Sequence, residues 1–340
     1  MTDAGIKGLC VSIDDTGMKD DRLGQCKFIT TLNIRHTHVS ESGIQIAFEN
    51  LPGLKNLLSN FPIQVLADLS VRFPQYSLTS FECCPYDSYC PNFSLYKIGS
   101  LELSASMCSS VTKVTIQVQI GITDVEVLGL LHLKNLRELS INGVFRHTEI
   151  TFEGGLAPLL VAFGKSLTLL KLECVDMEID VGVIIENCPE ISTLHLSDCS
   201  HVEQSEFLRS QKILSKLKFL TISCNPDRPE SNNFHSYYLT SLLSSPELCK
   251  INIEWVDHFT DQVLLDAGNR NQFYKLEKVQ LTYCDNITKR GIDVFFTDQN
   301  TLKELEFDDC KLVTNYDGKV WGMLIMEKNW ELKLFVNLSP

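Results

Sequence analysis

The feature that most constrains this chain is an apolar pattern, L-x-x-L-x-L, that returns about every 24 to 31 residues. Its clearest copies are Leu276–Leu281 and Leu302–Phe307, each followed three residues later by a cysteine, Cys284 or Cys310. One copy holds a strand and a return segment, which is too little to bury its own apolar face. Stacked copies bury that face against one another, so the pattern predicts a repeat array and not a conventional globular core.

Eleven copies align in one register, and each predicts a short strand whose two inner apolar residues point into the array. The copies are Ile29–Ile34, Leu54–Leu57, Leu78–Cys83, Val111–Ile116, Leu136–Ile141, Leu167–Leu172, Ile191–Leu196, Leu217–Ile222, Leu248–Ile253, Leu276–Leu281 and Leu302–Phe307. Between strands, residues 125–131, 263–265 and 291–295 carry apolar side chains at helical spacing. The predicted fold class is α/β, a leucine-rich-repeat solenoid with a curved parallel sheet on its concave side and helices on its convex side.

Polar pairs mark the expected corners between strands and helices. Thr123–Asp124 and Thr260–Asp261 each precede a helical segment. Their side-chain oxygens are predicted to accept hydrogen bonds from the first free backbone N–H groups of the helix that follows. Gly154–Gly155 also precedes an apolar run, but the rest of a phosphate-binding loop is missing, so this pair predicts a turn.

We expect one array over residues 1–338, with irregular places at its ends. Residues 1–27 begin in mid-repeat. They predict either a partial repeat whose upstream part is missing or a segment that folds back as an improvised cap. The alternation of apolar and other residues over 330–338 predicts a closing strand.

In two internal segments the repeat spacing is also irregular. Residues 83–108 predict an extra strand or a protruding loop, because Ile98, Leu101 and Leu103 repeat the strand spacing only 13 residues before Val111. Residues 224–238 are polar and hold two prolines, which predicts a loop insertion.

The net charge indicates which classes of partner the chain can bind. The formal net charge is -13, which disfavours nucleic acid and anionic membrane, because their phosphates require Lys and Arg. It favours a basic or neutral protein partner. Residues 1–9 lack the basic start and apolar core of a secretory signal, and no stretch is long and apolar enough for a membrane span. The expected location is therefore the cytoplasm or nucleus.

The 13 cysteines are predicted to be mostly free thiols, as expected in a reducing compartment. Two sets recur at fixed repeat positions, Cys199, Cys284 and Cys310 in one and Cys26, Cys108 and Cys188 in the other. Free cysteine packs as a small buried hydrophobe, so this recurrence indicates a packing role.

The sequence lacks the usual motifs of nucleotide-binding and metalloprotease chemistry, so no cofactor and no metal is predicted. Cys83, Cys84 and Cys90 form the densest cysteine cluster, but no histidine lies nearby to complete a zinc site, and a structural loop is favoured. His195 lies between two inner apolar residues, which favours a surface contact over a catalytic base.

The predicted partner-binding surface is the outward side of the strands. Candidate contact residues are Lys171, His195, Gln280 and Glu306 between the inner apolar positions, Glu254 and Asp308 just after them, and Trp255 and Tyr283 next in line. Two aromatics one repeat apart, near carboxylates, predict an anchor for a basic segment. The alternative is that both rings pack beneath the strand rim, at the position that cysteine holds elsewhere.

Residues 276–292 (LEKVQLTYCDNITKRGI) resemble the cysteine-containing subclass of leucine-rich repeats, and residues 191–199 (ISTLHLSDC) and 302–314 are similar to it. The subclass is typical of F-box/leucine-rich-repeat proteins, the substrate-recognition subunits of cullin-type ubiquitin ligases. The resemblance implies a protein-binding array. It also implies a Skp-type adaptor as partner if an F-box lies upstream, because no F-box can be placed within these residues.

The working hypothesis is a non-enzymatic protein-recognition module related to those subunits. The alternative is a stand-alone scaffold or regulator with no link to ubiquitin. A third hypothesis, an enzyme hidden in residues 83–108 or 224–238, has only the irregularity of those segments in its favour.

Overall fold

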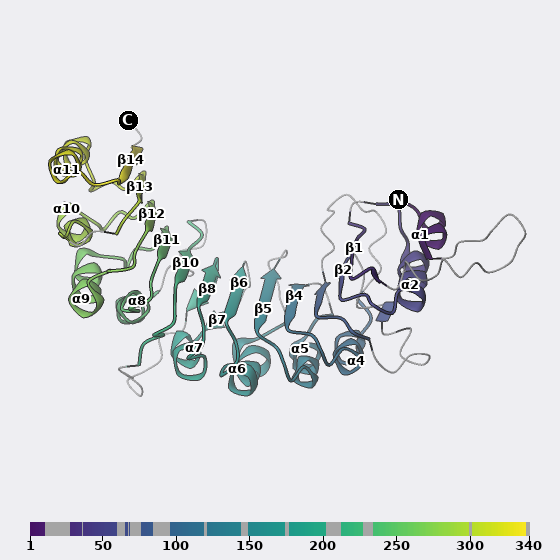
Figure 1. The fold of residues 1–340 in the computed structure, drawn as a ribbon. Coiled ribbons are helices and arrows are strands. Elements are labelled where there is room, and N and C mark those ends of the chain that lie inside the picture. The colour runs from purple at the N-terminus through teal and green to yellow at the C-terminus, as the bar shows by residue number, and fades with distance from the viewer. Residues whose placement is uncertain are drawn as a thin grey trace, which may run out of the picture. The chain divides into compact units, whose positions relative to one another are not determined.

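A computed structural model of the chain shows a mixed α/β protein in which short parallel strands alternate with helices (Figure 1). The described residues form two compact units, Met1–Phe163 and Gly164–Pro340. The structure describes residues 1–10, 28–35, 37–59, 65–66, 68, 76–83, 96–118, 121–143, 149–173, 177–201, 212–226, 234–298 and 301–337.

The first unit holds a parallel sheet in the order β1-β2-β3-β4-β5. Its strands are β1 Thr31–Asn33, β2 Asn56–Leu58, β3 Ser80–Cys83, β4 Lys113–Val118 and β5 Glu138–Gly143. Its helical segments are α1 Asp3–Cys10, α2 Glu41–Asn50, α4 Ser100–Met107, α5 Asp124–Leu128, η3 Gly129–His132, η4 Phe152–Leu156 and α6 Ala157–Phe163. The predicted inner residues are register partners, as Val114 beside Leu139 and Ile116 beside Ile141 show.

The second unit continues the same construction with strands in the order β6-β8-β10-β11-β12-β13-β14. These strands are β6 Leu169–Glu173, β8 Thr193–Ser197, β10 Phe219–Ser223, β11 Lys250–Glu254, β12 Lys278–Thr282, β13 Glu304–Asp308 and β14 Lys333–Asn337. The helical segments are α7 Val181–Asn187, α8 Ser236–Leu243, α9 Asp261–Asn271, α10 Lys289–Ile292, η6 Asp293–Phe295 and α11 Asn315–Lys328. Every neighbouring pair recorded in this row is parallel, and β14 lies beside β13 where alternation predicts a strand.

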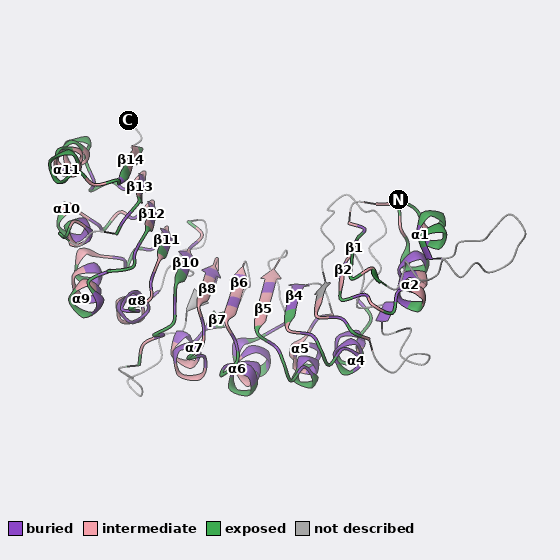
Figure 2. Cartoon of the chain, viewed as in Figure 1, coloured by how far each residue is buried: buried purple, intermediate pink, exposed green. Residues whose placement is uncertain are grey.

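Alternate burial along each strand separates an inner side from an outward side. In β6, β8, β12 and β13 the second and fourth residues are buried and the others are half-buried. Leu281 lies between its register partners Ile253 and Phe307, and all three are fully buried. In the second unit the helices lie on one side of the strands, and their buried faces complete the core (Figure 2). The predicted register is therefore confirmed.

Two local predictions are wrong. The proposed strand at Ile98–Leu103 is part of helix α4, in which Leu101 is buried while Ile98 just before it is 78% exposed. The three apolar residues match the spacing of a strand, but Ile98 and Leu103 are exposed, and the helix buries Leu101 and Ala105 on one face instead. Gly154–Gly155 lie not in a simple turn but in the single π-helical turn η4, which leads into α6.

Short pairing between β7 Glu178–Ile179 and β9 Ser200–His201 forms a second, two-stranded parallel sheet that no repeat position predicted. The predicted loop at 224–238 ends earlier than expected, because α8 starts at Ser236. Its residues 227–233, like residues 11–27 of the expected cap and residues 84–95 of the irregular segment, lie outside the described residues.

An aspartate at the start of one helix holds the residue that begins the next helix. The Asp261 carboxylate accepts hydrogen bonds from the backbone N–H of Thr288 at 2.8 Å and from its hydroxyl at 2.6 Å. The same two contacts link Asp124 to Thr151 and Asp3 to Ser40. Each aspartate thus fixes the spacing between two consecutive helices, and we call this contact the aspartate clamp.

The prediction that the Thr-Asp pairs cap the helices that follow them is wrong for Thr123 and Thr260. Thr123 and Thr260 make no side-chain cap to their own helices. Instead the clamped threonines do the capping, since Thr151 accepts from the backbone N–H of Gly154 and Thr288 from that of Arg290. The aspartate therefore acts between repeats, whereas the prediction placed it within one.

Glycine makes room for the clamp. A Cβ placed on Gly291 would lie 2.4 Å from the Asp261 Oδ1 atom, far inside van der Waals contact. Glycines at the same offset after the other clamped residues, Gly43 and Gly154, would meet Asp3 and Asp124 at similar range. The aspartate of one repeat thus needs a glycine in the next repeat, because a larger side chain there would occupy the space of its carboxylate.

We predict that Gly291→Ala lowers the free energy of unfolding by about 1–2 kcal/mol, because the new methyl group displaces the Asp261 carboxylate. In an Asp261→Ala background the same substitution should cost much less, and a double-mutant cycle of urea unfolding measures the difference. Gly322→Ala is the control, because nothing lies within 4 Å of its Cβ and alanine favours a helix. Equal costs in both backgrounds would contradict the explanation.

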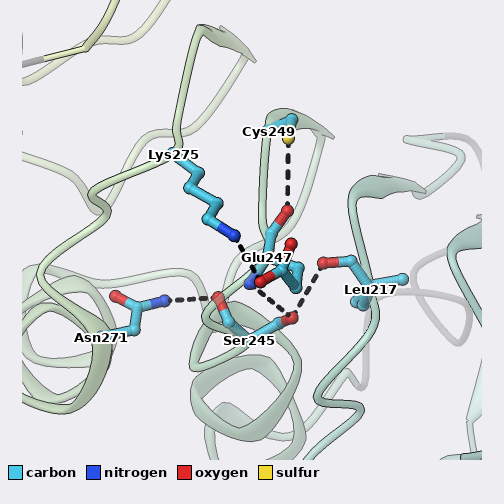
Figure 3. Close-up of polar contacts among 6 residues, drawn as sticks. All are labelled: Leu217, Ser245, Glu247, Cys249, Asn271 and Lys275. Carbon is cyan, nitrogen blue, oxygen red and sulfur yellow. Dashed lines mark hydrogen bonds and ion pairs between the residues drawn. The ribbon is translucent and has the colours of Figure 1, made fainter.

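Buried polar side chains tie the segments before the strands together (Figure 3). The Ser245 hydroxyl donates to the carbonyl of Leu217 at 2.8 Å. The Asn271 amide donates to the carbonyls of Leu243 at 2.7 Å and Ser245 at 2.9 Å, and its oxygen accepts from the N–H of Phe273 at 3.0 Å. Asn271 therefore satisfies three backbone groups that have little access to water.

The recurrent cysteines that the structure describes pack as predicted, and Cys26 lies outside the described residues. The Cys284 thiol lies 3.5 Å from the carbonyl oxygen of Ile253, and the Cys310 thiol lies 3.4 Å from that of Leu281, so each reaches back to the preceding strand. Burial raises the pKa of Cys108 and of Cys188 to about 12, which keeps both thiols protonated and unreactive. Free thiols among the described residues include Cys10, Cys108, Cys188, Cys199, Cys224, Cys249, Cys284 and Cys310.

Candidate protein-binding face

The outward side of the second unit presents its side chains in straight rows, because parallel strands in register place equivalent residues side by side. The middle row contains Lys171, His195, Thr221, Asn252, Gln280, Glu306 and Phe335. The second row contains Glu173, Ser197, Ser223, Glu254, Thr282, Asp308 and Asn337. Six of the eight predicted contact residues therefore lie in two adjacent rows.

A third row follows the strand ends and consists of Asp198, Trp255, Tyr283 and Asp309; we call it the post-strand row. All four residues have left-handed backbone conformations, with φ between 50° and 57°. Such a conformation costs a bulky residue on the order of 1–3 kcal/mol. It is held because each backbone N–H extends the ladder to the next strand, as in Trp255 to the Thr282 carbonyl at 3.1 Å and Tyr283 to the Asp308 carbonyl at 2.8 Å.

The left-handed turn decides the packing of the two aromatics. It directs the next residue inward, so that Val256 and Cys284 fill the buried position. Trp255 and Tyr283 remain half-buried, which rules out the alternative that they pack beneath the rim. Their rings are stacked, with centroids 3.8 Å apart and planes inclined by 18°. The sequence placed these two rings one repeat apart, and the fold brings them into contact.

Carboxylates surround this stack. The hydrogen bond to Asp309 raises the pKa of Tyr283, and the negative charges of Asp309, Asp308 and Glu254 raise the same pKa further. Glu254 accepts a hydrogen bond from the Ser223 hydroxyl at 3.3 Å. No ion pair joins Glu254, Glu306 or Asp308 to a cation in the part of the chain that the structure describes. The C-terminal ends of these strands are therefore acidic.

Lysine begins three of the neighbouring strands, β11, β12 and β14, whereas Glu304 begins β13 in the same register line. These lysines are Lys250, Lys278 and Lys333. Lys278 is paired with Glu304 on the neighbouring strand. The outward side of β11 thus changes from basic at Lys250 to acidic at Glu254, which would orient a charged partner.

Lys171 and His195 form a separate part of the face. Lys171 is paired with Glu173 at 2.7 Å, and His195 is its register partner on β8. The strands β10 and β11, with Thr221 and Asn252 in the middle row, separate His195 from Gln280. The fold therefore divides the predicted contact residues into this pair and the group around Trp255 and Tyr283.

His195 gives the face a pH dependence that can be measured. Burial lowers its pKa from 6.5, the charge of Lys171 lowers it further, and Glu173 opposes them. Its Nε2 atom is buried without a hydrogen-bond partner among the described residues. Because the folded pKa lies below the unfolded one, the unfolded state binds the proton first, and the stability that neutral His195 contributes is lost as pH falls below about 6.5.

We therefore expect an NMR titration of His195 to give a pKa below 6.5. The His195→Asn variant should lose less stability than the native chain between about pH 7 and pH 5. A pKa above 6.5 would mean that attraction to Glu173 outweighs burial.

The predicted contact residues did not include Asp198 or Asp309, which belong to this surface. The signal was present, because each directly precedes a recurrent cysteine, as Tyr283 does. Phe335 was also missed; it ends the middle row beside Glu306 and is 45% exposed.

Within the described residues no cluster of three or more His, Cys, Asp or Glu side chains could hold a metal ion. Cys84 and Cys90 of the predicted cysteine cluster lie outside those residues. Among the helices that the structure describes, none combines the length and hydropathy needed to cross a bilayer.

No protein-family model and no curated protein sequence matches the chain. A similar solved structure is the crystal structure of the Rad7 and Elc1 complex in yeast. The match covers 87% of this chain and 88% of that chain, with 12% sequence identity and a TM-score of 0.33. A TM-score of this size does not by itself establish a shared fold or a shared function.

Proposed function

We propose that this chain is a protein-recognition module of the leucine-rich-repeat solenoid type. It binds a protein partner on the outward strand face of the second unit and catalyses no reaction. The observation that carries the proposal is the outward face itself, in which seven parallel strands in register present rows of half-exposed polar residues and an aromatic stack. A broad, regular face is what repeat proteins use to bind partners.

The repeat assignment rests on features that recur from one strand–helix unit to the next. Buried inner residues, inward cysteines such as Cys284 and Cys310, and the aspartate clamp all return at constant offsets. These features support one mode of stacking in the repeats where they recur.

The residue pattern of 276–292 supports the finer proposal that the chain is related to substrate-recognition subunits of cullin-type ubiquitin ligases. Its test is reconstitution of the full chain with a purified Skp-type adaptor and cullin, followed by size-exclusion chromatography. A stable complex is expected if an F-box lies upstream of these residues, as the resemblance implies. Failure of all three proteins to co-migrate would favour the alternative, a scaffold or regulator unrelated to ubiquitin.

The binding face is tested with two matched charge reversals in the full chain. Glu306→Lys with Asp308→Lys changes the outward face, whereas Asp266→Lys with Glu327→Lys changes helices α9 and α11. Proteins captured from a cell extract are quantified by mass spectrometry, after circular dichroism has shown that both variants fold. The outward pair should lose partners that the helical pair retains. Equal capture by both variants would contradict the proposal.

A further inference from the structure

We propose that the Trp255–Tyr283 stack is a binding site for an arginine side chain within a basic peptide segment. The inference rests on the proposed function, because it names the partner chemistry of the same outward face. It starts from two observations, the parallel aromatic stack and the carboxylates of Glu254 and Asp308, which form no ion pair among the described residues.

The geometry of the stack selects a flat ligand. The two rings are nearly parallel, at 18°, and 3.8 Å apart, so no group can insert between them. Parallel rings also cannot enclose a tetrahedral ammonium group, which needs aromatic walls on several sides. A planar guanidinium can lie on the outer face of the stack and continue it at the same spacing.

Tyr283 covers the side of the Trp255 ring that is nearest β12. On the opposite side, nearest β10, the post-strand row offers no second ring. No left-handed residue directly follows β10, because Cys224 comes after Ser223 and is buried. In the part of the chain that the structure describes, the only ring contact of Trp255 is with Tyr283. The indole face nearest β10 is therefore the face that would receive the guanidinium.

The charges complete the site. Glu254 directly precedes Trp255, and Asp308 is the register neighbour of Thr282, which directly precedes Tyr283. The pKa of Tyr283 is raised by its hydrogen bond to Asp309 and, to a smaller extent, by the charges of Asp308 and Glu254, as expected for carboxylates close to the stack. An arginine above Trp255 would thus gain attraction to the ring and to Glu254 together, whereas a neutral or acidic side chain would gain neither.

The experiment uses fluorescein-labelled peptides and the full chain, with binding measured by fluorescence anisotropy. The probes carry fluorescein on the N-terminal amine and are (Gly-Arg)4-amide, its lysine counterpart and a counterpart with trimethyl-lysine. We expect the arginine peptide to bind at least about threefold more tightly than the lysine peptide of equal charge. Trp255→Asn should weaken arginine binding by about three- to thirtyfold, the range that cation–π attraction spans, and should remove the preference over lysine.

Tyr274→Asn is the control, because Tyr274 is an exposed aromatic residue (46%) outside the three rows and is also replaced by asparagine. It should leave all three affinities unchanged. Equal weakening of the arginine and lysine peptides by Trp255→Asn, tighter binding of trimethyl-lysine than of arginine, or no binding of the arginine peptide at millimolar concentration would each overturn the proposal. If the charge-reversal experiment succeeds while this one fails, the face still binds protein and only the arginine site is wrong.

Discussion

The Leu281→Asp variant should lose the folded structure around β12, with a fall in the free energy of unfolding of at least about 4 kcal/mol. Leu281 is fully buried between Ile253 and Phe307 on the neighbouring strands, and the Cys310 thiol bonds to its carbonyl. A carboxylate there would lie far from water and without a cation, which is among the costliest changes a core can undergo. Circular dichroism and urea unfolding of the full chain measure the loss.

The adjacent residue gives the control for this prediction. Thr282 lies in the second row on the outward side and is half-buried. Thr282→Ala should change the free energy of unfolding by no more than about 0.5 kcal/mol. Similar losses for the two variants would show that the inner and outward sides of β12 had been exchanged, because a shift of one residue reverses every side chain of a strand.

Asn271→Ala should lower the free energy of unfolding by about 3 kcal/mol. The substitution removes the partner of two carbonyls, those of Leu243 and Ser245, and of the Phe273 N–H. Asn271 is only 8% exposed, so water replaces these bonds poorly, and each unsatisfied buried group costs about 1–3 kcal/mol. Urea unfolding monitored by fluorescence measures the effect.

Asn286→Ala is the comparison for Asn271→Ala. The Asn286 amide also donates to a carbonyl, that of Asp257 at 2.7 Å, but it is exposed and makes a single bond. Its loss should cost less than about 1 kcal/mol, because water takes its place. If both variants lose the same stability, burial of the amide is not the source of the effect.

The strand register could be read from the sequence because burial on one side forces alternation. A slip of one residue would bring Lys278 and Gln280 into the core and expose Val279 and Leu281. The short return helices were harder to predict. In α4, Leu101 and the fully buried Ala105 lie on one helical face, but the same segment also fits the spacing of a strand.

Contacts between repeats could not be predicted, because a single repeat does not contain them. The Asp261 carboxylate meets Thr288 27 residues later, and Gly291 matters only because that carboxylate occupies the space its side chain would need. The aromatic stack is similar: the sequence showed that Trp255 and Tyr283 are equivalent, but their contact depends on a left-handed backbone that bulky residues rarely adopt.

In the post-strand row, the backbone conformation does not depend on which side chains the row presents to a partner. Its main chain is fixed by ladder hydrogen bonds from Trp255 and Tyr283, whatever side chains stand there. Asparagine and glycine adopt this backbone conformation more readily than the aromatics do. The two positions can therefore be randomised to obtain chains of altered binding preference on an unchanged scaffold.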